Sequence, residues 1–128
     1  MSHDRKEGII MKVTSYYPQI YAADVDATVK QYCDDLGFTV KHTQDGDAKL
    51  VVLQNEHGDR VDIMTLPDGQ KEGFAGMRMN VDKLEDGIDY FIVRGWRKIT
   101  SIETKFSGRY CTMETKEGVK VNLVHHVH

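Results

Sequence analysis

An internal repeat constrains the fold of this chain more than any other feature of its sequence. Residues 24–38 and residues 82–96 share one pattern: an acidic residue, apolar residues at helical spacing, a glycine thirteen positions after the acidic residue, and then an aromatic residue. The repeated positions are Asp24, Gly37 and Phe38 in the first segment, and Asp82, Gly95 and Trp96 in the second. Both segments are therefore predicted to form equivalent amphipathic helices.

The ends of both predicted helices carry suitable capping residues. Asp24 or Asp26 can cap the start of the first helix, and Asp82 with Glu85 resembles a capping box at the start of the second. A glycine after the last turn is typical of a helix that ends in the left-handed conformation. The helix boundaries are thus expected at the repeated acidic and glycine positions.

Strand-like segments surround both helices in the same order. One precedes each helix, at residues 16–22 and 76–81, and three follow. The following segments are residues 39–43, 49–54 and 60–66 in the first copy and residues 97–104, 109–114 and 119–124 in the second. The order is βαβββ twice, which predicts an α+β fold.

The length of the chain favours one domain rather than two. In a chain of 128 residues, each copy of the repeat is too short to bury much apolar surface alone. We predict a flexible N-terminal extension at residues 1–11 and a single domain at residues 12–128. Its two modules span about residues 12–70 and 74–128, with an exposed linker between them.

Composition and charge exclude several classes of function. The net charge is −3 and the pI about 6.0, so no basic surface for nucleic acid is expected. The sequence has neither an apolar stretch of membrane-spanning length nor an apolar run near its start, so no membrane association is expected. The two cysteines, Cys33 and Cys111, are too few for a disulfide framework. We therefore expect a cytoplasmic protein.

Part of this repeat, together with two later segments, also carries a resemblance to a known family. Residues 24–38, and residues 107–110 followed by residues 117–123, look like the vicinal oxygen chelate superfamily, which includes glyoxalase I, methylmalonyl-CoA epimerase and the bleomycin-resistance proteins. The resemblance covers about residues 12–126. It implies two βαβββ modules that form a curved mixed sheet around a small-molecule cleft. It also implies a homodimer as the expected assembly.

In metal-dependent members of this superfamily, the first and last strands of each module provide one metal ligand each. The resemblance places these positions at Tyr17, Asp62, Gly76 and Asn122. Only Asp62 is an ordinary metal ligand, whereas such a site needs several imidazoles or carboxylates. We therefore expect no inherited metal site and no cofactor.

The histidines at the C-terminus are a second candidate for metal binding. Strand alternation sends His126 and His128 to one face and His125 to the other, so the three cannot chelate one ion from a strand. We interpret this segment as a polar terminus.

Strand alternation separates polar from apolar side chains in the predicted sheet. If the inherited positions face the cleft, the same face carries Tyr17, Gln19 and Tyr21; Arg60, Asp62 and Met64; Gly76, Arg78 and Asn80; and Lys120, Asn122 and Val124. The opposite face is almost purely apolar, which supports this register. Solvated polar side chains on an open sheet are the simpler interpretation. The candidate ligand-binding residues are Tyr17, Gln19, Tyr21, Asp62, Met64, Arg78, Asn80 and Asn122.

Two further aromatic residues are candidates for ligand stacking. Trp96 directly follows a helix-ending glycine, where packing in the core is the more common role, and Phe106 lies in the hairpin before Gly108.

These features favour a metal-independent protein that binds a small organic molecule, as bleomycin-resistance proteins do. The alternative is a glyoxalase-like lyase or isomerase, with Asp62 as the candidate catalytic residue or with a metal held by His126 and His128. A third interpretation is a scaffold or sensor domain whose cleft no longer binds a ligand.

Overall fold

The structure, a computed structural model, describes residues 11–105 and 108–126. The first half contains β1 (Val13–Ala22), α2 (Val25–Leu36), β2 (Thr39–Gln44), β3 (Leu50–Gln54) and β4 (Arg60–Thr65). The second half contains β5 (Gly73–Val81), α3 (Leu84–Val93), β6 (Arg97–Lys98), β7 (Glu103–Lys105), β8 (Gly108–Glu114) and β9 (Lys120–His126). The predicted α+β class and repeated module order are confirmed, except that the strand expected at residues 97–104 is broken into β6 and β7.

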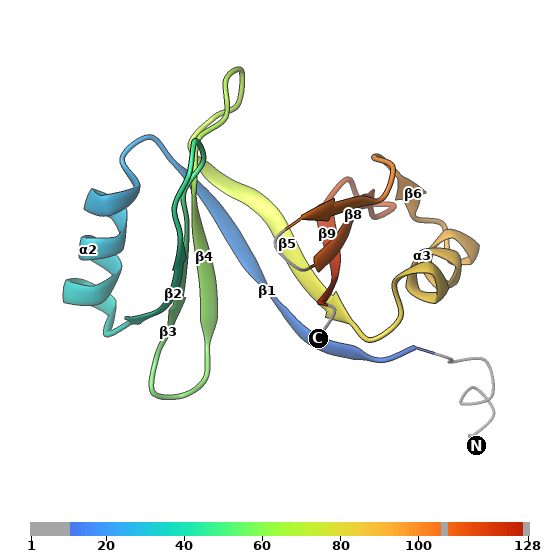
Figure 1. The fold of residues 1–128 in the computed structure, drawn as a ribbon, viewed down its shortest axis with the longest axis horizontal. Helices are drawn as coiled ribbons and strands as arrows, with labels where there is room; N and C mark the ends of the chain where they lie inside the picture. Colours follow the sequence, from blue (N-terminus) through green and yellow to red (C-terminus); the bar gives the residue numbers. More distant parts are fainter. Residues whose placement is uncertain (1–10, 106–107, 127–128) are drawn as a thin grey trace. The chain divides into compact units, whose positions relative to one another are not determined.

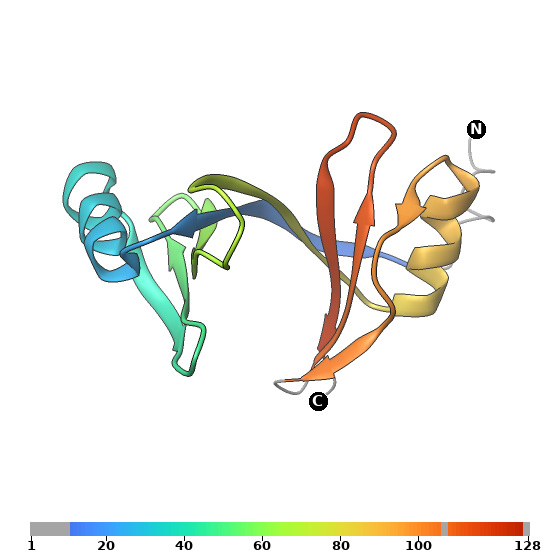
Figure 2. The same ribbon diagram turned by 90° about the horizontal axis from the view of Figure 1, so that it is seen from above.

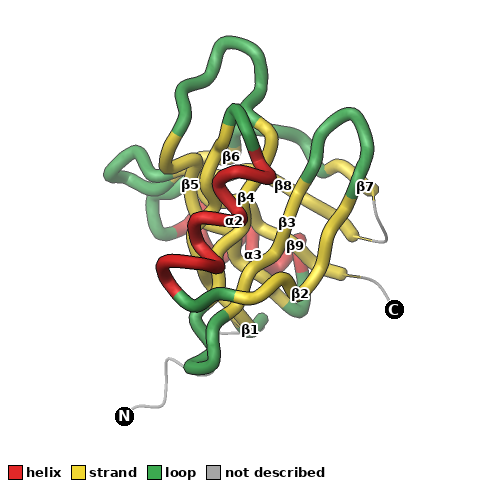
Figure 3. The backbone as a smooth tube through the Cα atoms, turned by 90° about the vertical axis from the view of Figure 1, so that its left-hand side faces the viewer, coloured by secondary structure: helices red, strands yellow, loops and turns green. Residues whose placement is uncertain are grey.

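The described chain divides into two compact units. The first unit is Tyr17–Gly76, and the second consists of residues 77–126 together with the residues up to Tyr16. Strand β1 therefore contributes its later residues to the first unit and its earlier residues to the second. Figure 3 distinguishes the two helices from the strands and loops by colour.

The first unit is a four-stranded sheet with one helix against it. Its strand order is β2-β3-β4-β1, with β1 parallel to β4 and the other neighbours antiparallel. Helix α2 lies against strands β3 and β4 (Figure 1). The buried apolar residues between them are Ala22, Val25, Val51, Leu53, Val61 and Ile63. Of these, Ala22, Val61 and Ile63 belong to the sheet face that strand alternation predicts to be apolar.

Helix α2 begins and ends at the predicted residues. Asp24 is the N-cap, and its Oδ1 accepts a hydrogen bond from the Ala27 N–H at 3.0 Å. Gly37 adopts the left-handed conformation with φ 75°, which a residue with a side chain rarely adopts. The acidic and glycine positions of the first repeat therefore define this helix.

The second unit contains helix α3, strands β6 to β9, β5 from Met77 onward and the first residues of β1. Strand β5 pairs in parallel with β9, β9 pairs antiparallel with β8, and β8 pairs with both β6 and β7. Helix α3 lies against β8 and β9 (Figure 2). The buried core is formed by Met11, Met79, Val81, Leu84, Ile88, Phe91, Cys111, Met113, Val121 and Leu123. Met11, predicted to end the N-terminal extension, is only 3% exposed in this core.

The capping box predicted for α3 is wrong. Lys83 is the N-cap and makes no side-chain capping hydrogen bond. The Asp82 carboxylate instead accepts a hydrogen bond from the Lys12 N–H at 2.7 Å, while the Asp82 N–H donates to the Lys12 carbonyl at 3.1 Å. Asp82 therefore fixes the chain that enters β1, because its carboxylate satisfies a backbone donor 70 positions away.

Trp96 packs inside the second unit. Its ring stacks on Phe91 with 4.1 Å between centroids and 19° between planes, and it lies against the buried core. This is the packing role expected from its position after a helix-ending glycine. Phe106 lies outside the described residues.

Among the residues that the structure describes, neither helix has the length and apolar character needed to cross a bilayer.

Candidate functional site

A buried amide and carboxylate lie together on the polar face of the first unit. Gln19 of β1 is the register partner of Asp62 of β4, so alternation directs both side chains to the same face. Gln19 Nε2 donates to Asp62 Oδ2 at 2.9 Å, and the two residues are 6% and 0% exposed. A carboxylate can remain buried only when it is hydrogen-bonded or paired. Gln19 therefore fixes the orientation of the candidate catalytic carboxylate.

Arg60 and Tyr17 form a second polar contact on the same face. Arg60 lies two residues before Asp62 on β4, and its Nη2 donates to the Tyr17 hydroxyl at 3.0 Å. The guanidinium carbon also lies 4.4 Å from the centre of the Tyr17 ring, which adds a cation–π attraction. Tyr17 is 4% exposed, and Arg60 is half-buried. Alternation places Arg60 on this face, although it is not among the predicted ligand-binding residues.

The other end of this face is apolar. Met64 of β4 is the register partner of Tyr21 on β1 and of Leu50 on β3. All three side chains are half-buried. The first unit thus brings five predicted ligand-binding residues onto one face, namely Tyr17, Gln19, Tyr21, Asp62 and Met64. Hydrogen-bonding groups lie at one end and apolar side chains at the other.

The polar face of the second unit centres on Arg78. This residue is 7% exposed, and its register partner on β9 is Asn122. Arg78 Nη2 lies 2.7 Å from His126 Nε2, and because a guanidinium only donates, the imidazole nitrogen accepts.

A glycine allows the rings beside Arg78 to pack closely. Tyr110 meets His126 edge to face, with 6.3 Å between ring centres. A Cβ atom on buried Gly108 would lie 3.1 Å from His126 Nδ1 and also 3.1 Å from the Tyr110 hydroxyl. A larger residue at this position would therefore displace one of the two rings.

The remaining predicted residues of the second unit have different surroundings. Asn80 donates its side-chain amide to the hydroxyl of Ser15 on β1, so it links two strands. Asn122 lies between Arg78 on β5 and Thr112 on β8 in the sheet register. Of the three predicted ligand-binding residues in this unit, Arg78 and Asn122 are therefore direct neighbours.

The four inherited metal-ligand positions do not fit a divalent ion. They carry a phenol at Tyr17, a carboxylate at Asp62, no side chain at Gly76 and an amide at Asn122. Within residues 11–105 and 108–126, no three His, Cys, Asp or Glu side chains are grouped as metal ligands. Only one of these donors is typical of a divalent metal site, so we derive no chemistry through a metal.

The C-terminal histidines lie on opposite faces of β9. His125 donates from Nδ1 to the Val81 carbonyl at 3.1 Å, whereas His126 accepts from Arg78 on the other side of the strand. His128, the other residue of the proposed pair, lies outside the described residues. The metal site that would use it stays a prediction.

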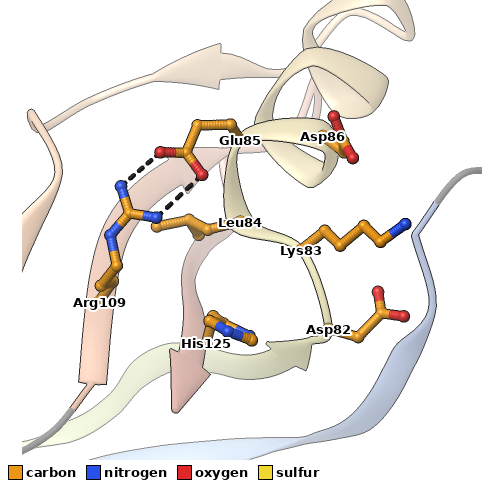
Figure 4. Close-up of a pocket in the computed structure, with 7 residues that line it drawn as sticks. All are labelled: Asp82, Lys83, Leu84, Glu85, Asp86, Arg109 and His125. Atoms are coloured by element: carbon orange, nitrogen blue, oxygen red, sulfur yellow. Dashed lines mark hydrogen bonds and ion pairs between the residues drawn. The ribbon is translucent and has the colours of Figure 1, made fainter. Parts of the chain in front are cut away.

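An open pocket at the start of α3 was not predicted from the sequence. It has a volume of about 310 Å³ and is lined by Asp82, Lys83, Leu84, Glu85, Asp86, Arg109 and His125 (Figure 4). Arg109 of β8 binds the Glu85 carboxylate through both terminal nitrogens, one of them at 2.9 Å. These hydrogen bonds lower the pKa of Glu85 to about 2. Two charged side chains therefore neutralise each other in the wall of this pocket (Figure 4).

Comparisons with known proteins find similarity at the level of structure. No family model matches the chain, and no curated protein matches it by sequence. Methylmalonyl-CoA epimerase from Mycobacterium tuberculosis superposes with a TM-score of 0.74 at 19% identity, covering 91% of this chain and 90% of the epimerase. A variant of the Streptomyces coelicolor epimerase in complex with 2-nitronate-propionyl-CoA gives 0.72 at 18% identity, covering 91% and 96%.

A third solved structure with the same fold is a protein of hypothetical status. It is a hypothetical protein from Bacillus halodurans, with a TM-score of 0.73 at 12% identity, covering 94% of this chain and 97% of that protein. Methylmalonyl-CoA epimerases are members of the vicinal oxygen chelate superfamily. The repeat, the two βαβββ modules and these superpositions agree that the chain has the glyoxalase/bleomycin-resistance fold of the vicinal oxygen chelate superfamily.

Proposed function

We propose that this protein binds a small organic molecule on the polar faces of its sheets, and that it does so without a resident divalent metal. The observation that carries the proposal is the mixed character of the face in the first unit. Gln19 and Arg60 supply directional hydrogen bonds near one end, and Tyr21 and Met64 supply apolar contact at the other. Such a combination suits a small organic ligand.

Protein-observed NMR tests the binding function directly. Amide spectra are recorded while a library of small acids, amides and aromatic compounds is added at millimolar concentration. We expect shifts confined to strands that carry the proposed ligand-binding residues, which are Tyr17, Gln19, Tyr21, Asp62, Met64, Arg78, Asn80 and Asn122. If no compound shifts any of these strands, the scaffold interpretation replaces the binding function.

The metal-independent part of the proposal is supported by the donor set and has its own test. Asp62 is the one typical metal ligand at the inherited positions, and it accepts a hydrogen bond from Gln19. Elemental analysis of untagged protein, before and after soaking with zinc, nickel and manganese, should find well below one equivalent per chain. Metal near one equivalent that disappears in Asp62→Ala would contradict metal independence.

A second candidate function is an isomerase or a glyoxalase-like lyase, and the superposition on methylmalonyl-CoA epimerases favours the isomerase. In an epimerase-type reaction a base removes a proton from the carbon next to a thioester carbonyl, and the electron pair moves onto the carbonyl oxygen. Asp62 is the candidate base, held by Gln19. Because Asp62 is 0% exposed, we place this candidate second.

Proton exchange distinguishes the epimerase from a protein that only binds. Methylmalonyl-CoA is incubated with the protein in D₂O, and deuterium at the acidic carbon is followed by NMR. An epimerase would incorporate deuterium faster than buffer, and Asp62→Asn would abolish this rate while Asp68→Asn in an exposed loop would not. Exchange at the buffer rate would leave the binding function as the proposal.

The assembly and the location also remain proposals. Strand β2 is an edge strand of the first unit with nearly all of its residues exposed, and such edges can pair with a second copy. We propose a homodimer, which light scattering coupled to gel filtration should detect at twice the chain mass. A cytoplasmic location is supported by Cys33 and Cys111, both of which are free thiols.

A further inference from the structure

The charge of Arg60 is not compensated by a carboxylate in the described structure. Among residues 11–105 and 108–126, no ion pair of its guanidinium with Asp or Glu is found, and its Nη2 donates to the Tyr17 hydroxyl at 3.0 Å. Its buried Nε–H has no acceptor in this part of the chain either. A partly buried cation with an unfilled donor is costly unless a further group satisfies it. An anionic group from a ligand would provide that compensation.

Arg60 lies at one end of the polar face, and the apolar side chains of this face lie at the other end. Met64 lies four positions after Arg60 on β4, which corresponds to about 13 Å along an extended strand. At that far end Tyr21, Met64 and Leu50 are neighbours in the register and are all half-buried. One face therefore presents a cationic end and an apolar end at the separation of a medium-length organic molecule.

From this arrangement we infer that the first unit binds an amphipathic carboxylate, with the carboxylate at Arg60 and the apolar body directed along the face toward Tyr21 and Met64. The inference rests on the proposed binding function and names the class of its ligand. Arg60 is then the residue that determines specificity for charge, and the planar guanidinium matches a carboxylate.

Three simple compounds test the inference in the full-length wild-type protein. Hexanoate has both the charge and the apolar chain, hexanamide keeps the chain without the charge, and acetate keeps the charge without the chain. Affinities are measured by NMR titration of the β1 and β4 amides. We expect hexanoate to bind about tenfold more tightly than either of the others, since a charged hydrogen bond and a short apolar chain each contribute at about this level.

Two variants assign the preference to Arg60. Arg60→Gln should reduce hexanoate affinity about tenfold and leave hexanamide affinity nearly unchanged, and Arg60→Lys should restore part of the hexanoate affinity. Arg97→Gln is the matched control, because Arg97 is 71% exposed and pairs with Glu114 in the second unit. It should bind hexanoate as the wild type does. If Arg60→Gln does not fold, the affinities of the wild type for the three compounds and the hexanoate affinity of Arg60→Lys still test the inference.

The outcomes separate this inference from the proposed function. Equal affinities for hexanoate and hexanamide, with binding on β1 and β4, would overturn the carboxylate inference and leave the binding function in place. A preference for hexanoate that persists in Arg60→Gln would overturn the role of Arg60. If none of the compounds binds while other library compounds shift these strands, the ligand class is wrong; if nothing shifts them, both proposals fail.

Discussion

The two modules have the same order of elements but bury their helices to different extents. Helix α2 buries one residue, Val25, whereas α3 buries four, which are Leu84, Gly87, Ile88 and Phe91. The second core also receives Met11 from outside its own module and the stacked ring of Trp96. A repeated sequence pattern therefore preserves the order of helices and strands, while the amount of burial depends on residues that the pattern does not include.

Removing one buried leucine from α3 gives the largest expected effect. Leu84 is 1% exposed in the core of the second unit, so Leu84→Ala should lower the free energy of unfolding by about 2–5 kcal/mol. The measurement is urea unfolding followed by fluorescence of Trp96, the one tryptophan of the chain, which lies in this core.

The same substitution in the other helix serves as its control. Leu36 ends α2 and is 59% exposed, so Leu36→Ala should change the free energy of unfolding by no more than about 0.5 kcal/mol. Losses of similar size in the two variants would mean that the two helices do not differ in burial as described.

The equivalent acidic residues of the two repeats provide a second comparison. Asp24 caps α2, whereas Asp82 binds the Lys12 N–H and leaves α3 without a side-chain cap. Asp24→Ala should therefore destabilise the protein by about 1 kcal/mol and accelerate hydrogen exchange in the first turn of α2.

In Asp82→Ala, exchange should instead increase at the Lys12 amide, which loses its acceptor. The first turn of α3 should keep its exchange rates, because it loses no capping bond. Faster exchange at the start of α3 in this variant would mean that Asp82 caps α3 as Asp24 caps α2.

These differences also show how far the sequence predicts the structure. Helical and strand periods predict α2, α3 and the separation of polar from apolar faces, because they depend on local spacing alone. Alternation likewise places Gln19 and Asp62 on a common side of the sheet. The role of Asp82 depends on a backbone amide 70 positions away, which no local pattern contains.

The candidate site shows the same limit. Arg60 is visible on the polar face from its position two residues before Asp62, but its contact with Tyr17 depends on the register between β1 and β4. The ion pair of Glu85 with Arg109 joins a helix and a strand that are 24 positions apart. Both interactions follow from tertiary pairing, so spacing could not predict them.

A glycine inside α3 provides a third comparison, with an expected gain in stability. Gly87 corresponds to Val29 in the first repeat, and a Cβ atom there would lie at an ordinary contact distance of 3.6 Å from Leu123. Gly87→Ala should raise the free energy of unfolding by about 0.5–1 kcal/mol, because alanine favours the helix and restricts the unfolded chain. Urea unfolding measures the gain.

Gly37→Ala is the contrasting variant, since its φ of 75° is unfavourable for alanine. It should destabilise the protein although no atom lies within 4 Å of the added carbon. A loss of stability in Gly87→Ala would mean that α3 packs more tightly than these distances indicate.

The smallest expected effect is a difference in acid sensitivity between the modules. Arg109 lowers the pKa of Glu85 to about 2 in the folded protein, and the equivalent position of the first repeat is Ala27, which carries no charge. A lowered pKa in the folded state means that the ion pair stabilises the fold above the ordinary carboxyl pKa, and that this contribution decreases as the pH falls toward 2.

The stability advantage of the wild type over Glu85→Gln should therefore be constant above about pH 5 and decrease below it. Because both side chains are partly solvent-exposed, added salt should reduce it. Urea unfolding of both proteins between pH 7 and about pH 3, with Glu103→Gln as an exposed control, measures this dependence; an advantage that did not change with pH would show that the Arg109 contact does not lower the pKa of Glu85.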